Sequence, residues 1–179
     1  VLKLQDGCDQ CCSFCIIPTT RGRSRSLPPD SAVEKYRDWA RKGAKEVVLS
    51  GINLSAYGED LVPRTTLAEL LARLEGEENT AWIRISSIEP SGLTEDFLDV
   101  VRRSRKICPH FHVPLQSGDP DVLRRMNRPY TFEEYAERVH ALARMRLDTS
   151  IGSDMMVGFP GETEQQFRNT LQAVEDLPF

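Results

Sequence analysis

Residues 2–15 read LKLQDGCDQCCSFC, a short apolar run that leads through a glycine into four closely spaced cysteines. The apolar run at 2–4 predicts a short buried strand, and the pair Asp6-Gly7 predicts the turn that ends it. The cysteines at positions 8, 11, 12 and 15 are therefore expected on a loop directly after this strand. The fifth cysteine, Cys108, stands alone and is expected to be a small buried apolar residue.

This cysteine cluster allows three interpretations. Four-cysteine zinc sites usually need two C-x2-C pairs about 12 or more residues apart, whereas these pairs abut. A redox dithiol usually lies at a helix N-terminus, but residues 12–18 look like a loop. An iron–sulfur cluster is the third interpretation, held through the spacing Cys8-x3-Cys12-x2-Cys15. Three thiolates would leave one iron of a four-iron cluster free to bind a small molecule.

Outward from this stretch, the hydrophobic pattern predicts five strands, each followed by a helical segment. The strands are expected at 2–4, 47–49, 82–85, 111–115 and 151–157, and the helices at 28–43, 66–74, 94–103, 131–142 and from 163 onward. The helix at 131–142 is the main part of a split helical stretch. Three helices begin with the capping-box pattern, at Thr66, Thr131 and Thr163. In the last helix we expect Phe167, Leu171 and Val174 to be buried.

Five strand–helix units spaced by about 35 residues predict an α/β fold with parallel strands. An open doubly wound sheet and a barrel-type sheet both satisfy this order. In both, ligands bind at the C-terminal ends of the strands. The polar and glycine-rich segments fall there, at 50–53, 86–90, 116–118 and 158–162, together with the cysteine loop. The sequence therefore predicts a single site on one rim of the sheet.

The composition is that of an ordinary folded domain. The chain has 179 residues, 40% hydrophobic and 28% charged, with a formal net charge of −4. This excludes a disordered tail, a collagen-like repeat and a small disulfide scaffold. No apolar run approaches the roughly 18 residues of a membrane span, and the acidic balance gives no global reason to bind nucleic acid. We expect one domain over residues 1–179, part of a longer cytoplasmic protein.

Beyond the cysteine loop, the sequence resembles the methylthiotransferase branch of the radical S-adenosylmethionine (SAM) enzymes along nearly its whole length. The matching segments are 7–22, Val113-Pro114-Leu115-Gln116-Ser117-Gly118, Tyr130-Thr131 and 157–163. Segments 51–53, 57–61, 84–90 and 108–112 are most similar to the bacterial subgroup that modifies N6-threonylcarbamoyladenosine in tRNA. Sibling subgroups act on isopentenyladenosine in tRNA or on a ribosomal protein. A non-enzymatic zinc-binding α/β module is the alternative from a different class.

The resemblance implies a partial (β/α)6 radical SAM barrel, of which five βα units are present. It implies a 4Fe-4S cluster that chelates SAM, an electron donor that reduces it, and a radical that takes hydrogen from the adenine ring. A second SAM would donate a methyl group. Three further cysteines for a second cluster and a C-terminal RNA-binding module do not occur within these residues. This chain is therefore expected to cleave SAM without completing thiomethylation.

The resemblance also implies particular site residues. Cys8, Cys12 and Cys15 would bind the cluster, and Cys11 would be a bystander, because neighbouring side chains on an extended loop point in roughly opposite directions. The SAM-binding residues implied by the matching motifs are Phe14, Gly51, Asn53, Gln116, Ser117, Asp154, Gly158, Gly161 and Glu162.

Overall fold

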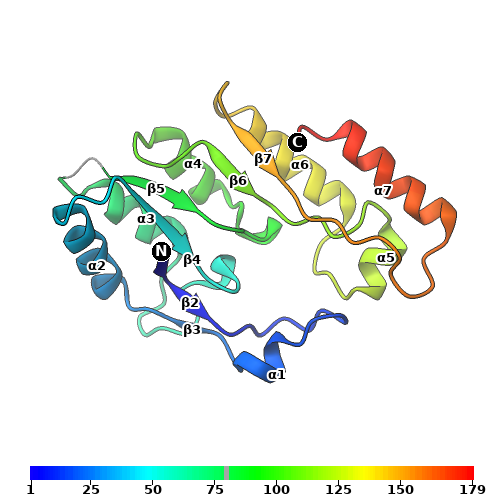
Figure 1. Cartoon of the computed structure of the whole chain (residues 1–179), viewed down its shortest axis with the longest axis horizontal. Helices are drawn as coiled ribbons and strands as arrows, with labels where there is room; N and C mark the ends of the chain where they lie inside the picture. Colours follow the sequence, from blue (N-terminus) through cyan, green and yellow to red (C-terminus); the bar gives the residue numbers. More distant parts are fainter. Residues whose placement is uncertain (79–80) are drawn as a thin grey trace.

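The computed structural model describes residues 1–78 and 81–179 and shows a curved sheet of parallel strands with helices along its outside (Figure 1). In chain order the parallel strands are β1 (Leu2–Lys3), β4 (Glu46–Ser50), β5 (Trp82–Ile85), β6 (His110–His112) and β7 (Ser150–Gly152). Strands β1, β4 and β5 form one parallel sheet, in which Leu2 pairs with Leu49 and Val47 pairs with Ile83. Strands β6 and β7 form another, and a parallel bridge from Ser87 to His112 links the two.

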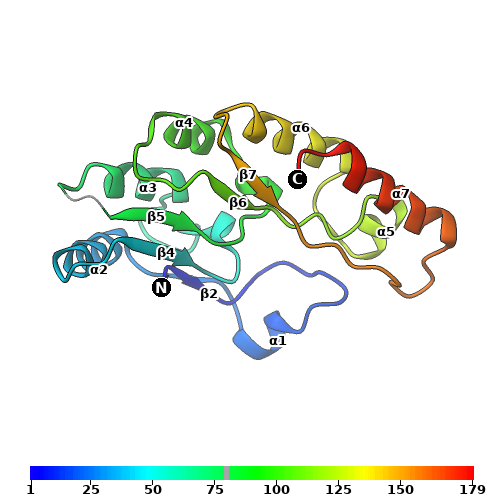
Figure 2. The ribbon, with the colours of Figure 1, turned by 45° about the horizontal axis from the view of Figure 1, so that its top comes forward.

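The helices connect these strands and cover their buried side (Figure 2). They are α2 (Pro29–Arg41), α3 (Leu67–Glu75), α4 (Glu95–Arg103), α5 (Pro120–Arg125), α6 (Phe132–Ala143) and α7 (Glu164–Asp176), with short 3-10 turns η1 (Leu54–Ala56) and η2 (Pro90–Gly92). Alternate strand residues such as Val47, Leu49 and Ile83 are buried against them. The result is the predicted partial barrel with five βα units.

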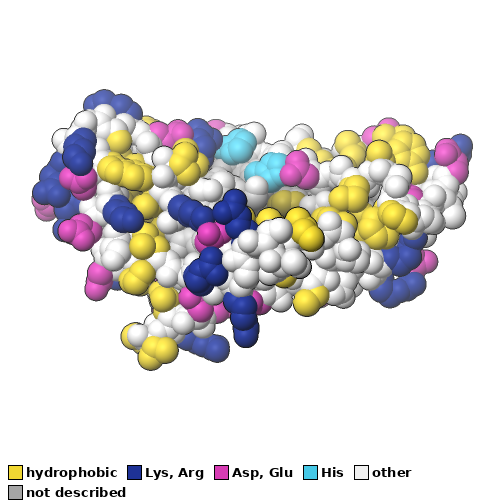
Figure 3. Space-filling model, turned by 60° about the horizontal axis from the view of Figure 1, so that its bottom comes forward, with side chains coloured by type: hydrophobic (Ala, Val, Ile, Leu, Met, Phe, Trp, Pro, Cys, Tyr) yellow, Lys and Arg dark blue, Asp and Glu magenta, His cyan; other side chains and the backbone are white. Residues whose placement is uncertain are grey.

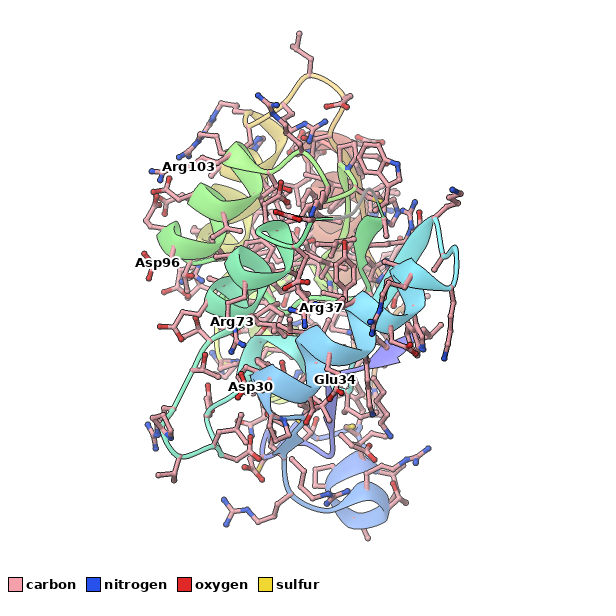
Figure 4. The ribbon with its side chains drawn as sticks, turned by 90° about the vertical axis from the view of Figure 1, so that its left-hand side faces the viewer. Asp30, Glu34, Arg37, Arg73, Asp96 and Arg103 are labelled. Carbon is pink, nitrogen blue, oxygen red and sulfur yellow. The ribbon has the colours of Figure 1, made fainter. Side chains whose placement is uncertain are left out.

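Local sequence signals set the beginnings of several helices. The three predicted capping boxes are all present, at Thr66, Thr131 and Thr163, so each threonine side chain accepts from a backbone N–H that has no partner within its helix. Neighbouring helices are also joined on the surface, where Arg73 Nη2 of α3 lies 2.6 Å from Asp30 Oδ1 of α2 (Figure 4). Such an exposed pair contributes at most about 1 kcal/mol.

Three strands are shorter than predicted. The first strand breaks after Lys3, and the chain continues as β2 (Gln5–Asp6), which pairs antiparallel with an unpredicted strand, β3 (Arg25–Ser26). The fourth strand ends at His112 rather than at 115, since Pro114 has no N–H for the ladder. The fifth ends at Gly152 rather than at Val157, which is exposed. A short helix, α1 (Ile17–Arg21), also replaces the end of the loop predicted at 12–18.

The buried face of α7 was predicted wrongly. Phe167, Leu171 and Val174 are 38%, 49% and 42% exposed, whereas Thr170 and Ala173 are buried. The reason is the close approach of α7 to the turn that follows β6. A Cβ atom added to Gly118 would lie 2.6 Å from Ala173 Cβ, so only the small side chains of this helix can face that turn.

No helix within the described residues is long and apolar enough to cross a membrane.

Candidate functional site

The predicted loops do gather at the C-terminal ends of the parallel strands. In Figure 1 the strand arrowheads point toward the side that holds the cysteine loop, here defined as residues 7–15, and helix α5. This is the end at which parallel α/β sheets bind ligands. The candidate site is therefore built from five loops on this rim.

A glycine turn starts the cysteine loop. Gly7 has a φ of +73°, and a Cβ atom there would lie 2.0 Å from the carbonyl oxygen of Arg23. That close approach lets the N–H of Cys8 donate to the carbonyl of Gly22 at 3.1 Å. Glycine is required here for both its backbone conformation and its lack of a side chain.

Three of the four cysteines fit a shared site. Burial raises the pKa of the Cys8 thiol; the N–H of Gln10 and the Asn53 side chain oppose this, and the nearby sulfurs of Cys12 and Cys15 add to it. The N–H of Cys15 donates to the carbonyl of Cys12 at 3.1 Å, which curls the loop between them. Cys11 is exposed.

This donor set suits a cluster in which each thiolate binds a different iron. Among the residues that the structure describes, no group of three or more Cys, His, Asp or Glu side chains is arranged around a single metal ion. A four-iron cluster does not require that arrangement, because its protein ligands surround the cluster and do not converge on one point. Cys8, Cys12 and Cys15 therefore fit the cluster that the sequence motif implies.

The cysteine loop docks on the turn between α5 and α6. The N–H of Ser13 donates to the carbonyl of Met126 at 3.1 Å, and the Ser13 hydroxyl donates to the carbonyl of Arg125 at 2.8 Å. From the same turn, Asn127 Nδ2 donates to the carbonyl of Cys11 at 2.8 Å. The backbone of Cys11 thus serves as an attachment point, while its side chain faces solvent.

Gln5, which sequence reasoning missed, joins the cysteine loop to the loop after β4. Its buried side chain donates to the carbonyl of Gly7 at 2.7 Å and to the hydroxyl of Ser24 at 2.8 Å, and accepts from the N–H of Asn53 at 2.8 Å. Gly51 makes room for it, since a Cβ there would lie 3.2 Å from Gln5 Oε1. Both predicted residues of this loop thus contact Gln5, which is bonded in turn to Gly7 at the start of the cysteine loop.

A buried ion pair joins the segment after β5 to the α5–α6 turn. Arg128 pairs with Glu89, and their side chains are only 3% and 18% exposed. Arg128 Nε donates to the Tyr130 hydroxyl at 3.0 Å, and Nη1 donates to Cys12 Sγ at 3.2 Å. The neighbouring pair Tyr130-Thr131 matched the family in the sequence, but the contact of Arg128 with a cysteine was not predicted.

The two predicted site residues after β6, Gln116 and Ser117, have different surroundings. Gln116 has a φ of +72°, which is unusual for a residue other than glycine and occurs most often at functional positions. Ser117 is fully buried; its hydroxyl pairs with that of Thr170 at 3.1 Å and accepts from the N–H of Asp119. In this structure Ser117 holds α7 in place and does not face the rim.

The fifth strand contributes a carboxylate and a tight turn. Asp154 is exposed, and its Oδ2 lies 3.2 Å from His112 Nε2; histidine and acidic side chains meet on this open face in Figure 3. Farther along, Glu162 Oε2 accepts from the N–H groups of Gly158 and Phe159, at 2.5 and 3.0 Å. A Cβ at Gly161 would lie 3.0 Å from Arg125 Nη1.

The ring of Phe14 is 38% exposed on the cysteine loop. An aromatic side chain left open beside the cysteines can stack on a flat ligand. Two of the structurally central residues, Gln5 and Glu89, were not singled out in the sequence, although Glu89 lies within the predicted rim segment 86–90. Their importance comes from contacts with residues more than 35 positions away.

Residues 2–174 match the family model of the Radical SAM superfamily. The chain belongs to this superfamily, which agrees with the iron–sulfur cluster and SAM expected from its motifs.

Among curated proteins, the chain is 42% identical over 181 residues to threonylcarbamoyladenosine tRNA methylthiotransferase MtaB of Bacillus subtilis (strain 168), which covers 99% of this chain and 40% of the relative. It is 39% identical over 173 residues to tRNA-2-methylthio-N(6)-dimethylallyladenosine synthase of Thermoanaerobacter pseudethanolicus, covering 97% and 37%. The resemblance to methylthiotransferases is therefore confirmed. The chain spans about 40% of the length of these relatives.

Solved structures confirm the fold class. The cobalamin-dependent S-adenosylmethionine radical enzyme OxsB matches with a TM-score of 0.79 at 14% identity, over 97% of this chain and 26% of that one. The radical S-adenosylmethionine methyltransferase TsrM of Kitasatospora setae, with cobalamin and a [4Fe-4S] cluster bound, matches with a TM-score of 0.76 at 20% identity, over 97% and 34%.

Proposed function

We propose that this chain is the catalytic core of a radical SAM methylthiotransferase that acts on N6-threonylcarbamoyladenosine in tRNA. The observation that carries the proposal is the loop at the C-terminal ends of the parallel strands (Figure 1) that holds Cys8, Cys12 and Cys15 and is docked on Gly22 and on the α5–α6 turn. When bound there, a 4Fe-4S cluster with SAM supplies one-electron cleavage and hydrogen abstraction.

The chain itself would bind and orient SAM around that position. Asn53 and Gly51 would hold its methionine part beside Cys8, a role supported by the bonds that link this loop to Gln5. Phe14 and the turn at 158–162 would flank the adenine. Gln116 and Asp154 would supply polar contacts, consistent with the left-handed backbone of Gln116 and the exposure of Asp154. Ser117 would act indirectly, through the position of α7.

The choice of nucleoside is supported by similarity. Identity is 42% to the relative named for threonylcarbamoyladenosine, against 39% and 36% to relatives named for dimethylallyladenosine. The proposal requires tRNA and an external one-electron donor as partners, and a cytoplasmic location. The sulfur-inserting steps would need parts of the full protein outside these residues.

The test is to delete the gene and measure modified nucleosides of total tRNA by mass spectrometry. We expect the methylthio form of threonylcarbamoyladenosine to disappear and its precursor to accumulate, with recovery when the intact gene is restored. Loss of the methylthio form of dimethylallyladenosine, with the other retained, would show that the proposed substrate is wrong.

A further inference from the structure

Arg128 lies in the turn between α5 and α6, and its charged side chain is almost wholly withdrawn from solvent. Its side chain is 3% exposed, whereas that of Arg124 on the same segment is 76% exposed. A buried guanidinium is costly unless its donors are paired. The partners of those donors therefore indicate the role of Arg128.

Each nitrogen of the Arg128 fork has a different partner. Nη2 bonds to Glu89 Oε2, Nε to the Tyr130 hydroxyl and Nη1 to Cys12 Sγ at 3.2 Å. The guanidinium also lies over the Tyr130 ring, 5.0 Å from its centroid. Because a guanidinium is planar and rigid, fixing two of its nitrogens aims the third.

The two supporting partners are themselves held. The Tyr130 hydroxyl donates to the carbonyl of Leu115 at 3.0 Å, which ties it to the end of the fourth unit. Glu89 lies at the start of η2, after β5. Arg128 thus contacts Cys12 from a position fixed by Glu89 and Tyr130, which lie outside the cysteine loop.

The charge of Arg128 is retained despite its burial. Arginine is not deprotonated in proteins, and Arg128 is paired with the carboxylate of Glu89. A permanent cation consequently donates a hydrogen bond to the sulfur of a proposed cluster ligand. Hydrogen bonds to ligand sulfurs and the net charge nearby are two of the factors that set iron–sulfur reduction potentials.

We infer that Arg128 is a positioning residue that fixes the Cys12 sulfur and makes the iron–sulfur cluster bound there easier to reduce, while Glu89 holds Arg128 and offsets part of its charge. This inference rests on the proposed function, since it requires a cluster at Cys8, Cys12 and Cys15. It predicts opposite effects for the two partners: loss of the cation lowers the reduction potential, and loss of the anion raises it.

The experiment uses the 179-residue chain, reconstituted without oxygen with iron and sulfide, before SAM is added. The variants are Arg128→Met, Arg128→Lys, Glu89→Gln and the double variant Arg128→Met/Glu89→Gln, with Arg124→Met as the exposed control. Iron content, circular dichroism and a redox titration followed by electron paramagnetic resonance are measured for each. The double variant avoids leaving Glu89 buried without its cation, which could unfold the single variant.

We expect Arg128→Met to bind iron and to shift the reduction equilibrium about tenfold toward the oxidised cluster, or about 59 mV for a one-electron couple. Arg128→Lys and the double variant should shift in the same direction by less, Glu89→Gln in the opposite direction, and Arg124→Met not at all.

A cluster whose potential is the same in the wild-type chain, Arg128→Met and the double variant overturns the inference. Shifts of the same sign in Arg128→Met and Glu89→Gln also overturn it, because they would indicate general loosening of the site. A wild-type chain that binds no cluster overturns the proposed function and this inference together, and iron content identifies that case first.

Discussion

The cysteine loop and the turn after β7, residues 158–162, lie on the same rim but are held in different ways. The cysteine loop is bonded to Gly22, to Asn53 through Gln5, and to the α5–α6 turn more than 110 residues away. In the β7 turn, by contrast, the carboxylate of Glu162 accepts from the N–H groups of Gly158 and Phe159. The cysteine loop is positioned by residues of several distant elements, whereas the β7 turn combines its own bonds with contacts from one distant residue, Arg125, whose Nη1 donates to the carbonyl of Pro160 at 2.7 Å.

The two loops have different structural requirements. A loop that must place several sulfurs around one cofactor needs fixed points on more than one element, because no short loop can orient three side chains by itself. A turn that borders a ligand needs fewer fixed points, and here one distant arginine adds to the bonds within the turn. Three predictions sharpen the contrast, in order of decreasing effect.

The largest effect is expected at the neighbouring cysteines. Cys12→Ala should abolish cluster binding and SAM cleavage, because it removes a thiolate that Arg128 and the loop place beside Cys8. Cys11→Ala should keep both, since the cluster motif does not include its sulfur and its backbone carbonyl, which accepts from Asn127, is unchanged. Iron content after anaerobic reconstitution checks both variants. Iron loss in Cys11→Ala with retention in Cys12→Ala would mean that the motif is C-x2-C-x3-C.

The second prediction compares two glycines that have almost the same backbone φ. Gly7 and Gly158 have φ values of +73° and +74°, but a Cβ at Gly7 would strike the backbone of Arg23, whereas a Cβ at Gly158 meets nothing within 4 Å. Gly158→Ala should cost about 1–2 kcal/mol of unfolding free energy from backbone strain alone. Gly7→Ala adds the steric clash and should cost about 2–5 kcal/mol in total.

Urea unfolding of the two alanine variants, followed by circular dichroism, measures this difference. Equal losses of stability would show that backbone conformation, and not the close approach to Arg23, decides the requirement for glycine at position 7.

The smallest effect is expected at Glu162. Glu162→Gln keeps an oxygen that can accept from Gly158 and Phe159 but replaces a charged acceptor with a neutral one, so the loss should be about 1 kcal/mol. Thermal unfolding checks the size of the loss. A decrease as large as that of Gly7→Ala would indicate that the bonds of Glu162 within the turn, more than the donation from Arg125 to Pro160, hold its shape.

Much of the fold could be predicted from local patterns. The five strand–helix units follow from hydrophobic periodicity, and the threonine capping boxes mark three helix starts because the cap and its partner are three residues apart. The positions of the rim loops follow from that order. Those parts depend on neighbours in sequence, which is why the sequence is sufficient for them.

The rest depends on contacts between distant residues. The exposed face of α7 was predicted as buried because its apolar spacing is helical, but the fit of Ala173 against Gly118 decides which side packs. Gln5 gave no signal, since its partners are Gly7, Ser24 and Asn53. Arg128 is similar: it lies next to the matching pair Tyr130-Thr131, but the sulfur that it contacts lies 116 positions away.

The docking of the cysteine loop on the α5–α6 turn has a consequence for the order of events during synthesis. A chain leaves the ribosome from its N-terminus and its parts fold in that order, so the cysteines emerge well before Asn127 and Arg128 exist. Until the fourth unit has folded, the loop lacks the bonds that fix Ser13, Cys11 and Cys12. The thiols therefore spend the middle of translation on an unanchored segment, and a cluster delivered to the fully docked loop has to arrive after residue 128 has been made.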